Sequence, residues 1–284
     1  MASGNGRLYR FFILSLLLGV FIELAALISI FREDSNPDGN IAIVELKEEI
    51  HDSKQVIKDL KKYEEAENVK AIVLRVDTPG GTVGASQEIH DEVERIAQKK
   101  KIIVSMGDVA ASGGYYLSAS ATKIVANPGT ITGSIGVIAT YFVIDDLLKK
   151  LHLKWEVIAA GKMKDIGSPL RSLTAEEKTF MKALTDDMHA QFIEAVAKGR
   201  SLPLEKAKSL SDGRVYTGRQ AKDLGLVDEL GGLEYAVTLA GKLAGLQEKI
   251  DPIYPKEEND GFWHQIMGRT SFKQGLNVLY KLFP

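Results

Sequence analysis

The stretch Gly107 to Val137, GDVAASGGYYLSASATKIVANPGTITGSIGV, decides how this chain folds and carries its candidate chemistry. The apolar residues 102–106 before Ser112 indicate a strand, and the small residues 115–121 after it favour a closely packed helix. A serine on a tight turn between a strand and a helix is one way to present a nucleophile. A serine beside glycines is also typical of a turn or a helix cap, so this motif alone does not assign a role.

The segments on both sides of this stretch alternate between strand-like and helix-like patterns. Short apolar runs predict strands at 41–46, 71–76, 102–105, 123–126, 136–144 and 155–160. Amphipathic patterns predict helices at 53–67, 82–99, 174–199 and 233–246, and the third begins with a capping-box pair, Thr174 and Glu177. This alternation predicts an α/β fold with a mainly parallel sheet and flanking helices.

Two glycine pairs follow neighbouring predicted strands. Gly80 and Gly81 come after residues 71–76, and Gly113 and Gly114 come after residues 102–105. Adjacent parallel strands end at the same edge of a sheet, which is the usual place for a site in an open α/β sheet. We therefore expect backbone N–H groups of both turns to face one carbonyl oxygen of a bound substrate.

Composition excludes several classes of function. The 284 residues are 45% hydrophobic and 26% charged, enough for one large or two modest domains. A net charge of -2 without a long basic block disfavours nucleic acid as a partner. The absence of cysteine excludes thiol catalysis and disulfides. We find no metal-binding motif, and GGTVGAS at 80–86 is neither dinucleotide fingerprint nor P-loop, so we expect no metal and no cofactor.

The N-terminal residues predict a membrane anchor. Residues 11–31 are apolar except for Glu23 and small polar residues, and as a helix they would reach about 31 Å, enough to span a bilayer. Arginines at 7 and 10 precede this segment and acidic residues follow it, so residues 1–10 are expected in the cytoplasm and the rest across the membrane. A cleaved signal peptide is the alternative, but no convincing A-x-A site precedes the linker 32–40.

A serine nucleophile needs a base, and the sequence does not identify any histidine as that base. The five histidines fall in charged helical stretches, before a strand or in the tail, and none has surroundings typical of a base. A lysine can substitute when burial disfavours its ammonium form. Lys162 and Lys164 lie in the loop before the helix at 174–199. The tail, 251–284, is amphipathic and could lie on a membrane, on another subunit or on its own domain.

Five ordered motifs carry a resemblance to a known family. They are DTPGG at 77–81, ASGGYY at 111–116, NPGTITGSIGV at 127–137, GKMKD at 161–165 and GRVYTGRQAKDLGLVDELGG at 213–232. From about Ile41 to Gly245 the chain resembles the signal peptide peptidase A family of membrane-anchored Ser-Lys peptidases, which are related in fold to ClpP and the crotonases. The resemblance implies a peptidase domain at 41–250 that degrades cleaved signal peptides at the cell membrane, on its extracytoplasmic side.

The resemblance also implies a role for each matching site residue. Ser112 would be the nucleophile, Lys164 its general base, and Ser134 the group that orients the lysine. The oxyanion donors would be the backbone N–H groups of Gly113 and of Gly81, although the PGG turn could also use Gly80. The implied reaction is acyl transfer through an acyl-enzyme, without a cofactor.

The chain departs from the long family form, which has two tandem halves, because only one half is present. The resemblance therefore implies a ring-shaped homo-oligomer with sites between subunits, in which Lys164 could reach Ser112 of a neighbour. Alternatives stay open: a related ClpP-class membrane protease, a crotonase-type acyl-CoA enzyme, or a catalytically silent scaffold that gathers membrane partners.

Overall fold

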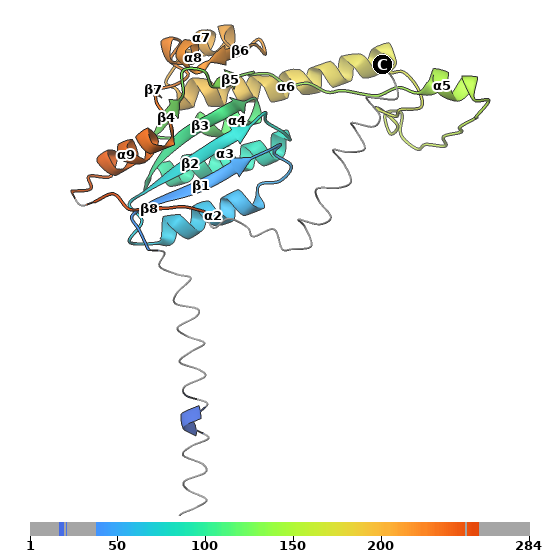
Figure 1. Ribbon diagram of the computed structural model, residues 1–284. Coiled ribbons are helices and arrows are strands. Elements are labelled where there is room, and N and C mark those ends of the chain that lie inside the picture. The colour runs from blue at the N-terminus through green and yellow to red at the C-terminus, as the bar shows by residue number, and fades with distance from the viewer. Residues whose placement is uncertain (1–16, 20, 22–37, 248, 256–284) are drawn as a thin grey trace, which may run out of the picture. The chain divides into compact units, whose positions relative to one another are not determined.

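The computed structural model describes residues 17–19, 21, 38–247 and 249–255 (Figure 1). The chain divides into two compact units, Met1–Ile253 and Tyr254–Pro284. Most of the predicted membrane helix 11–31 and of the predicted tail 251–284 lies outside the described residues, so both stay predictions. Within the described ranges, no helix is both long enough and apolar enough to cross a membrane.

A mainly parallel sheet forms the centre of the first unit. Its order is β6-β5-β3-β2-β1-β8, and β4 pairs with both β3 and β7. Every pairing is parallel except that of β5 with β6. This confirms the predicted α/β fold with a mainly parallel sheet. The strands are β1 (Ile41–Lys47), β2 (Ala71–Thr78), β3 (Lys101–Ala111), β4 (Lys123–Ala126), β5 (Ile131–Gly133), β6 (Val215–Thr217), β7 (Glu229–Leu230) and β8 (Pro252–Ile253).

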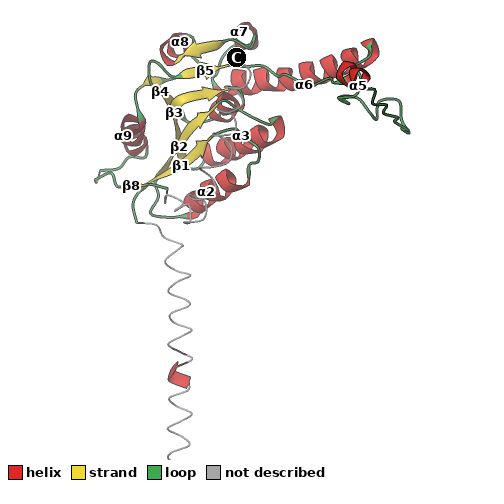
Figure 2. Cartoon of the chain, turned by 45° about the vertical axis from the view of Figure 1, so that its right-hand side comes forward, coloured by secondary structure: helices red, strands yellow, loops and turns green. Residues whose placement is uncertain are grey.

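Helices cover both faces of this sheet (Figures 1 and 2). Alternate residues of β1 show why, since Ala42 and Val44 pack with α2, α3 and α4, whereas Ile41 and Ile43 pack with α9. A sheet buried on both faces explains the nearly continuous apolar runs in its strands. The helices are α2 (Lys54–Glu65), α3 (Val83–Ala97), α4 (Gly113–Ser118), α5 (Asp145–Lys150), α6 (Ala175–Gly199), α7 (Leu204–Ser209), α8 (Gly218–Asp223) and α9 (Leu233–Leu243).

Two predicted strands are wrong. Residues 136–144 and 155–160 form no strand in the described chain, and α5 lies between them. None of the described strands pairs with either segment. Ile138 is 89% exposed and Ile158 is fully exposed, so neither side chain enters the core that the described residues form.

The central strand β3 is longer than its apolar run predicts and leads directly to Ser112. A register irregularity between Val76 and Thr78 of β2 shifts the second half of β3 relative to its neighbour. The Asp77 carboxylate fills this gap, because its Oδ1 accepts a hydrogen bond from the Val109 N–H at 3.1 Å. The last residues of β3 pair with β5, and the strand ends at Ala111, one residue before the candidate nucleophile.

Candidate active site

Ser112 occupies the junction between β3 and α4 in a conformation that side-chain-bearing residues rarely adopt. Its backbone angles are φ 52° and ψ -120°. Such a conformation costs on the order of 1–3 kcal/mol and persists only where the surroundings impose it. Here they do so through the Ser112 N–H, which donates to the Gly133 carbonyl of β5 at 2.8 Å, and through the buried first turn of α4. The strained strand-to-helix turn is the arrangement that exposes a nucleophilic hydroxyl.

The PGG turn after β2 lies directly beside this junction. A Cβ on Gly80 would lie 2.8 Å from the Gly113 nitrogen, and Gly80 also has a φ of 113° that favours glycine. A Cβ on Gly113 would lie 3.3 Å from the Gly81 nitrogen. The glycines predicted to meet at one sheet edge therefore do meet, and their lack of side chains is what allows the approach.

The backbone N–H groups of Gly80, Gly81 and Gly113, beside Ser112, differ in their hydrogen bonding. The Gly80 N–H donates to Thr78 Oγ1 at 3.1 Å. Within the described part of the chain, the N–H groups of Gly81 and Gly113 donate to no acceptor. Of the two glycines in the PGG turn, Gly81 is therefore the one whose N–H is available to a ligand.

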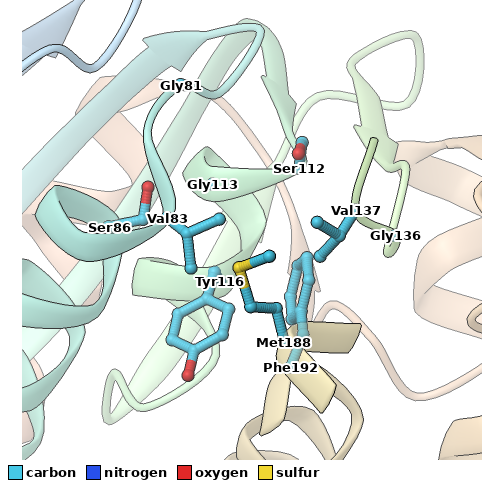
Figure 3. A pocket seen from close by; sticks show the side chains of 10 residues that line it. All are labelled: Gly81, Val83, Ser86, Ser112, Gly113, Tyr116, Gly136, Val137, Met188 and Phe192. Atoms are coloured by element: carbon cyan, nitrogen blue, oxygen red, sulfur yellow. The ribbon is translucent and has the colours of Figure 1, made fainter. Parts of the chain in front are cut away.

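A small apolar pocket opens next to Ser112 (Figure 3). It has about 290 Å³ of space between its walls, including the open mouth. The Tyr116 ring packs against Phe192 at a tilt of 50°, with centroids 4.6 Å apart, and burial raises the pKa of Tyr116. The lining residues come from the PGG turn, α3, the β3–α4 junction, the segment after β5, and α6: Gly81, Val83, Ser86, Ser112, Gly113, Tyr116, Gly136, Val137, Met188 and Phe192.

Ser134 lies on the neighbouring strand end rather than in the pocket wall. Gly133 pairs with Ala111 across β5 and β3, so Ser134 follows β5 at the same edge where Ser112 follows β3. Ser134 has a φ of 51°, and its N–H donates to the Arg214 carbonyl at 2.8 Å. The structure thus brings Ser134 to the edge that carries Ser112, with its side chain partly exposed.

Lys164 is not among the residues that line the Ser112 pocket. Its side chain is exposed and, among the described residues, makes no ion pair. The neighbouring Lys162 differs, because its ammonium pairs with Glu176 at 2.6 Å. Of the two lysines in the GKMKD motif, Lys164 is therefore the one with an uncommitted amine.

Helix α6 separates the lysine loop from the pocket. Arg171 binds Glu177 in the first turn of α6, whereas the pocket residues Met188 and Phe192 lie further along the same helix. At about 1.5 Å per residue, the separation along the axis is roughly 16 to 22 Å. Both overall views show the segment around α5 beside the outer end of α6, away from β3 (Figures 1 and 2).

The pocket walls were missed by sequence reasoning. Met188 and Phe192 are four residues apart on α6, a spacing that also fits ordinary core packing, and Val83 follows the PGG turn without a distinctive pattern. These residues line a pocket only because segments far apart in the sequence come together in the fold. Among the described residues, no cluster of histidine and carboxylate side chains could hold a metal ion.

Comparisons with known proteins identify the family. Residues 94–247, more than half of the chain, match a protein-family model described as "Peptidase family S49". Residues 39–132 match a second model, described as "Clp protease". The second match fits the ClpP-like sheet described above. The two matched ranges overlap at 94–132, which contains Ser112.

Individual relatives agree with this assignment. A putative protease of Synechocystis is 47% identical over 68% of this chain and 69% of its own length. A putative signal peptide peptidase SppA of Enterococcus faecium is 35% identical over 81% of this chain and 67% of its own length. The chloroplastic serine protease SPPA of Arabidopsis thaliana is 36% identical over 68% of this chain but 29% of its own. The chain therefore belongs to peptidase family S49, the family of the signal peptide peptidase A proteins that its motifs resemble.

Proposed function

We propose that this peptidase is a serine peptidase in which Ser112 attacks the peptide carbonyl and Lys164 is the general base. The observation that carries the proposal is the backbone around Ser112. A strained serine stands at the rim of an apolar pocket, beside two N–H groups that have no acceptor among the described residues. A buried turn of this kind is costly for a merely structural serine, and it suits a nucleophile.

The reaction follows from these groups. The neutral amine of Lys164 takes the Ser112 hydroxyl proton as Oγ bonds to the carbonyl carbon, and the N–H groups of Gly81 and Gly113 bind the resulting oxyanion. Collapse breaks the peptide bond, and the ammonium returns the proton to the leaving amine. A water molecule, deprotonated by the same lysine, then releases the acid and restores Ser112. Ser134 is proposed to hold the lysine by a hydrogen bond.

The pocket supports a preference for small apolar side chains at the cleavage point. The pocket is small and lined mainly by apolar groups, so it suits one small apolar side chain of a substrate. Because one relative is named a signal peptide peptidase, we propose that the substrates are signal peptides left after secretion. Residues 11–31 would anchor the chain in the same bilayer, with the N-terminus cytoplasmic and the peptidase domain outside.

We further propose that the site is completed between copies in a ring. Two features support this proposal: Lys164 does not line the Ser112 pocket of its own chain, and the segment around it exposes large apolar side chains. A neighbouring copy that covered this segment would also remove Lys164 from water, which disfavours the ammonium form. The exposed residues are Ile138, Phe142, Leu147, Leu151, Leu153, Trp155, Val157 and Ile158.

The dyad is tested by cleavage of an apolar, signal-peptide-like peptide by the wild type and by Ser112→Ala and Lys164→Ala. We expect both variants to lose at least about 10⁴-fold in kcat, as for the loss of a nucleophile or its base in a serine protease. Lys162→Ala is the matched control, since it removes an exposed lysine from the same loop and should retain activity. Full activity in either dyad variant would refute the assignment of that residue.

Completion between copies is tested by mixing the two inactive variants. If Lys164 acts on Ser112 of a neighbour, a mixture of Ser112→Ala and Lys164→Ala contains interfaces with both native residues and recovers part of the activity. Recovery should accompany an oligomer in light scattering. An active, monodisperse monomer of the wild type would contradict the proposal.

The remaining alternatives predict different results in the same assays. A crotonase-type enzyme would bind an acyl-CoA and would leave the peptide intact. A silent scaffold would form the oligomer but would fail to react with a fluorophosphonate probe at Ser112. We expect probe labelling of Ser112 in the wild type and its loss in Lys164→Ala.

A further inference from the structure

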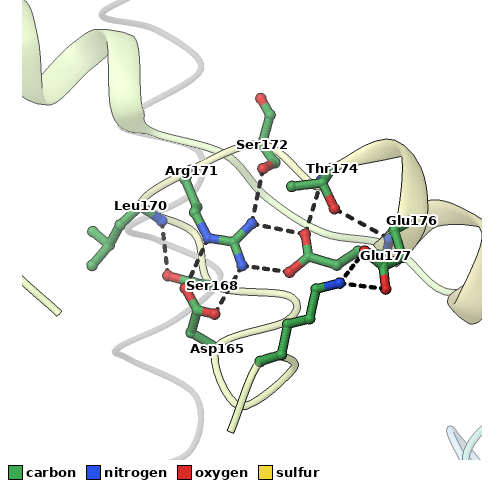
Figure 4. A network of polar contacts seen from close by, with 9 residues as sticks. Asp165, Ser168, Leu170, Arg171, Ser172, Thr174, Glu176 and Glu177 are labelled. Carbon is green, nitrogen blue, oxygen red and sulfur yellow. Dashed lines mark hydrogen bonds and ion pairs between the residues drawn. The ribbon is translucent and has the colours of Figure 1, made fainter. Parts of the chain in front are cut away.

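Arg171 ties the turn that carries Lys164 to the start of α6 (Figure 4). Its Nε and Nη2 donate to the two oxygens of Asp165, each at 2.8 Å. Its Nη2 and Nη1 donate to the two oxygens of Glu177 at 2.6 and 2.8 Å. Nη1 also donates to the Ser172 carbonyl at 3.2 Å. All five N–H donors of the guanidinium are therefore used, four in two bidentate forks and the fifth on the Ser172 carbonyl.

The carboxylate at the helix end of this contact is held rigidly. Glu177 is the third residue of α6, its side chain is 4% exposed, and it accepts a hydrogen bond from the Thr174 N–H at 2.8 Å. The Thr174 hydroxyl accepts in turn from the Glu177 N–H, which completes a capping box. Hydrogen bonds from Arg171 and from the Thr174 N–H lower the pKa of Glu177 to about 2. Glu177 is thus a fixed anion at the start of the helix.

The carboxylate at the other end adjoins the proposed base. Asp165 directly follows Lys164 and is part of a tight turn, in which the Lys164 N–H donates to the Gly161 carbonyl at 3.1 Å and the Ser168 N–H donates to the Asp165 carbonyl at 3.0 Å. The hydrogen bonds from Arg171 lower the pKa of Asp165. Fixing the Asp165 side chain therefore fixes the backbone from which the long Lys164 side chain extends.

The start of α6 does not itself require this second fork. The capping box already provides acceptors for the N–H groups of Thr174 and Glu177 without Asp165. What Arg171 adds is the link from that turn to the lysine loop. A lysine side chain has four rotatable bonds, so its amine can reach a hydroxyl in one geometry only if its Cα is held in place.

We propose that Arg171 is a positioning residue for Lys164, acting through Asp165 and Glu177 to hold the base loop against the first turn of α6. The inference rests on the proposed role of Lys164 as the base. It holds whether Lys164 serves Ser112 of its own chain or of a neighbouring copy, because the network lies within one chain.

The test compares Arg171→Gln and Arg171→Lys with the wild type in the full-length protein. We expect kcat to fall about 100-fold in Arg171→Gln, the usual order for misplacing a catalytic group by about 1 Å, while KM changes by less than about twofold. Arg171→Lys keeps the charge but loses both forks, and should recover only part of kcat. Guanidinium ion at low millimolar concentration should restore part of the kcat of Arg171→Ala and none of that of Lys164→Ala.

The chain supplies a matched control in Arg95. This residue also joins two carboxylates from different elements, Glu64 of α2 and Glu92 of α3, and is 40% exposed where Arg171 is 34% exposed. Arg95→Gln should lower thermal stability and leave kcat within about twofold once the folded fraction is counted. An Arg171→Gln variant that loses no more kcat than Arg95→Gln would overturn the inference.

Two further variants separate the possible failures. If Lys164→Ala retains activity, the proposed dyad itself is wrong. If Lys164→Ala is inactive and Arg171→Gln is fully active, the dyad stands and only the positioning role falls. If Arg171→Gln does not fold by circular dichroism, Asp165→Asn replaces it, because that change weakens the fork to the loop and keeps the capping box intact; unchanged kcat in Asp165→Asn would then overturn the inference.

Discussion

The two halves of the candidate site, around Ser112 and around Lys164, are held in place by different interactions. Around Ser112 the geometry is set by backbone: a strained turn, two glycine turns in contact, and strands buried on both faces. Around Lys164 it is set by side-chain charges on a largely exposed loop. Close packing does not depend on pH, whereas ion pairs weaken when their carboxylates are protonated. The nucleophile half is therefore held at any pH at which the chain is folded, and the hold on the base half depends on ionised carboxylates.

The first way to break this comparison is Gly81→Ala, for which we expect the largest effect. The added methyl group would lie closer than van der Waals contact to the Ile50 carbonyl, so the turn must move and its N–H with it. Loss of one oxyanion donor costs about 100- to 1000-fold in kcat. Gly84→Ala is the control, because its methyl group meets nothing within 4 Å and alanine favours a helix. Unchanged kcat in Gly81→Ala would show that its N–H is not a donor.

A second experiment tests whether close packing sets the Gly113 side of the turn. A methyl group on Gly113 would overlap the Ser86 hydroxyl of α3. Gly113→Ala should therefore be destabilised, and Ser86→Gly in the same chain should relieve the overlap. We expect a coupling free energy of about 1 kcal/mol or more between the two changes in denaturant unfolding. Simple additivity would mean that the overlap is relieved by movement elsewhere.

The strain at Ser112 provides a third test. Glycine accepts a positive φ without steric cost, so Ser112→Gly should raise the free energy of unfolding by about 1 kcal/mol. Ser112→Ala keeps the strain and should not gain this stability. The difference in free energy of unfolding between the two variants, measured by chemical denaturation, isolates the cost of the backbone conformation. Equal stability would argue against strain at this position.

The base half should instead respond to acid, the smallest effect that we predict. The pKa of Glu177 is about 2 in the folded chain, because of Arg171 first and the Thr174 N–H second, against an ordinary value near 4.5. A depressed pKa contributes stability that is present above the ordinary value and lost as pH falls from about 4.5 towards 2. The difference in melting temperature between wild type and Glu177→Gln should therefore shrink over that window. A difference independent of pH would contradict an ionic role.

Sequence reasoning predicted the features that follow from local pattern. The apolar runs of β1, β2 and β3 located the sheet, Thr174 and Glu177 located the start of α6, and the glycine pairs located the edge where Gly81 and Gly113 meet. Each of these depends on residues close in sequence or on the rule that neighbouring parallel strands end together.

The rest depends on contacts that no local pattern encodes. The apolar segments 136–144 and 155–160 predicted strands, but a strand also needs a partner, and none of the described strands pairs with them. The pocket forms where α3, α4 and α6 converge, and the forks of Arg171 join residues on both sides of it in the chain. Local pattern alone does not separate Lys162 from Lys164; the resemblance points to Lys164, and the structure adds that Lys162 pairs with Glu176.

The distance between Lys164 and the Ser112 pocket within one chain also bears on how a cell could tolerate such an enzyme. Under the proposed mechanism, a newly made copy that has folded but met no other copy carries a nucleophile without its base. Such a copy would stay inactive for as long as it is dilute. Its activation would depend on crowding in the bilayer, and specific activity would rise with the concentration of the enzyme itself.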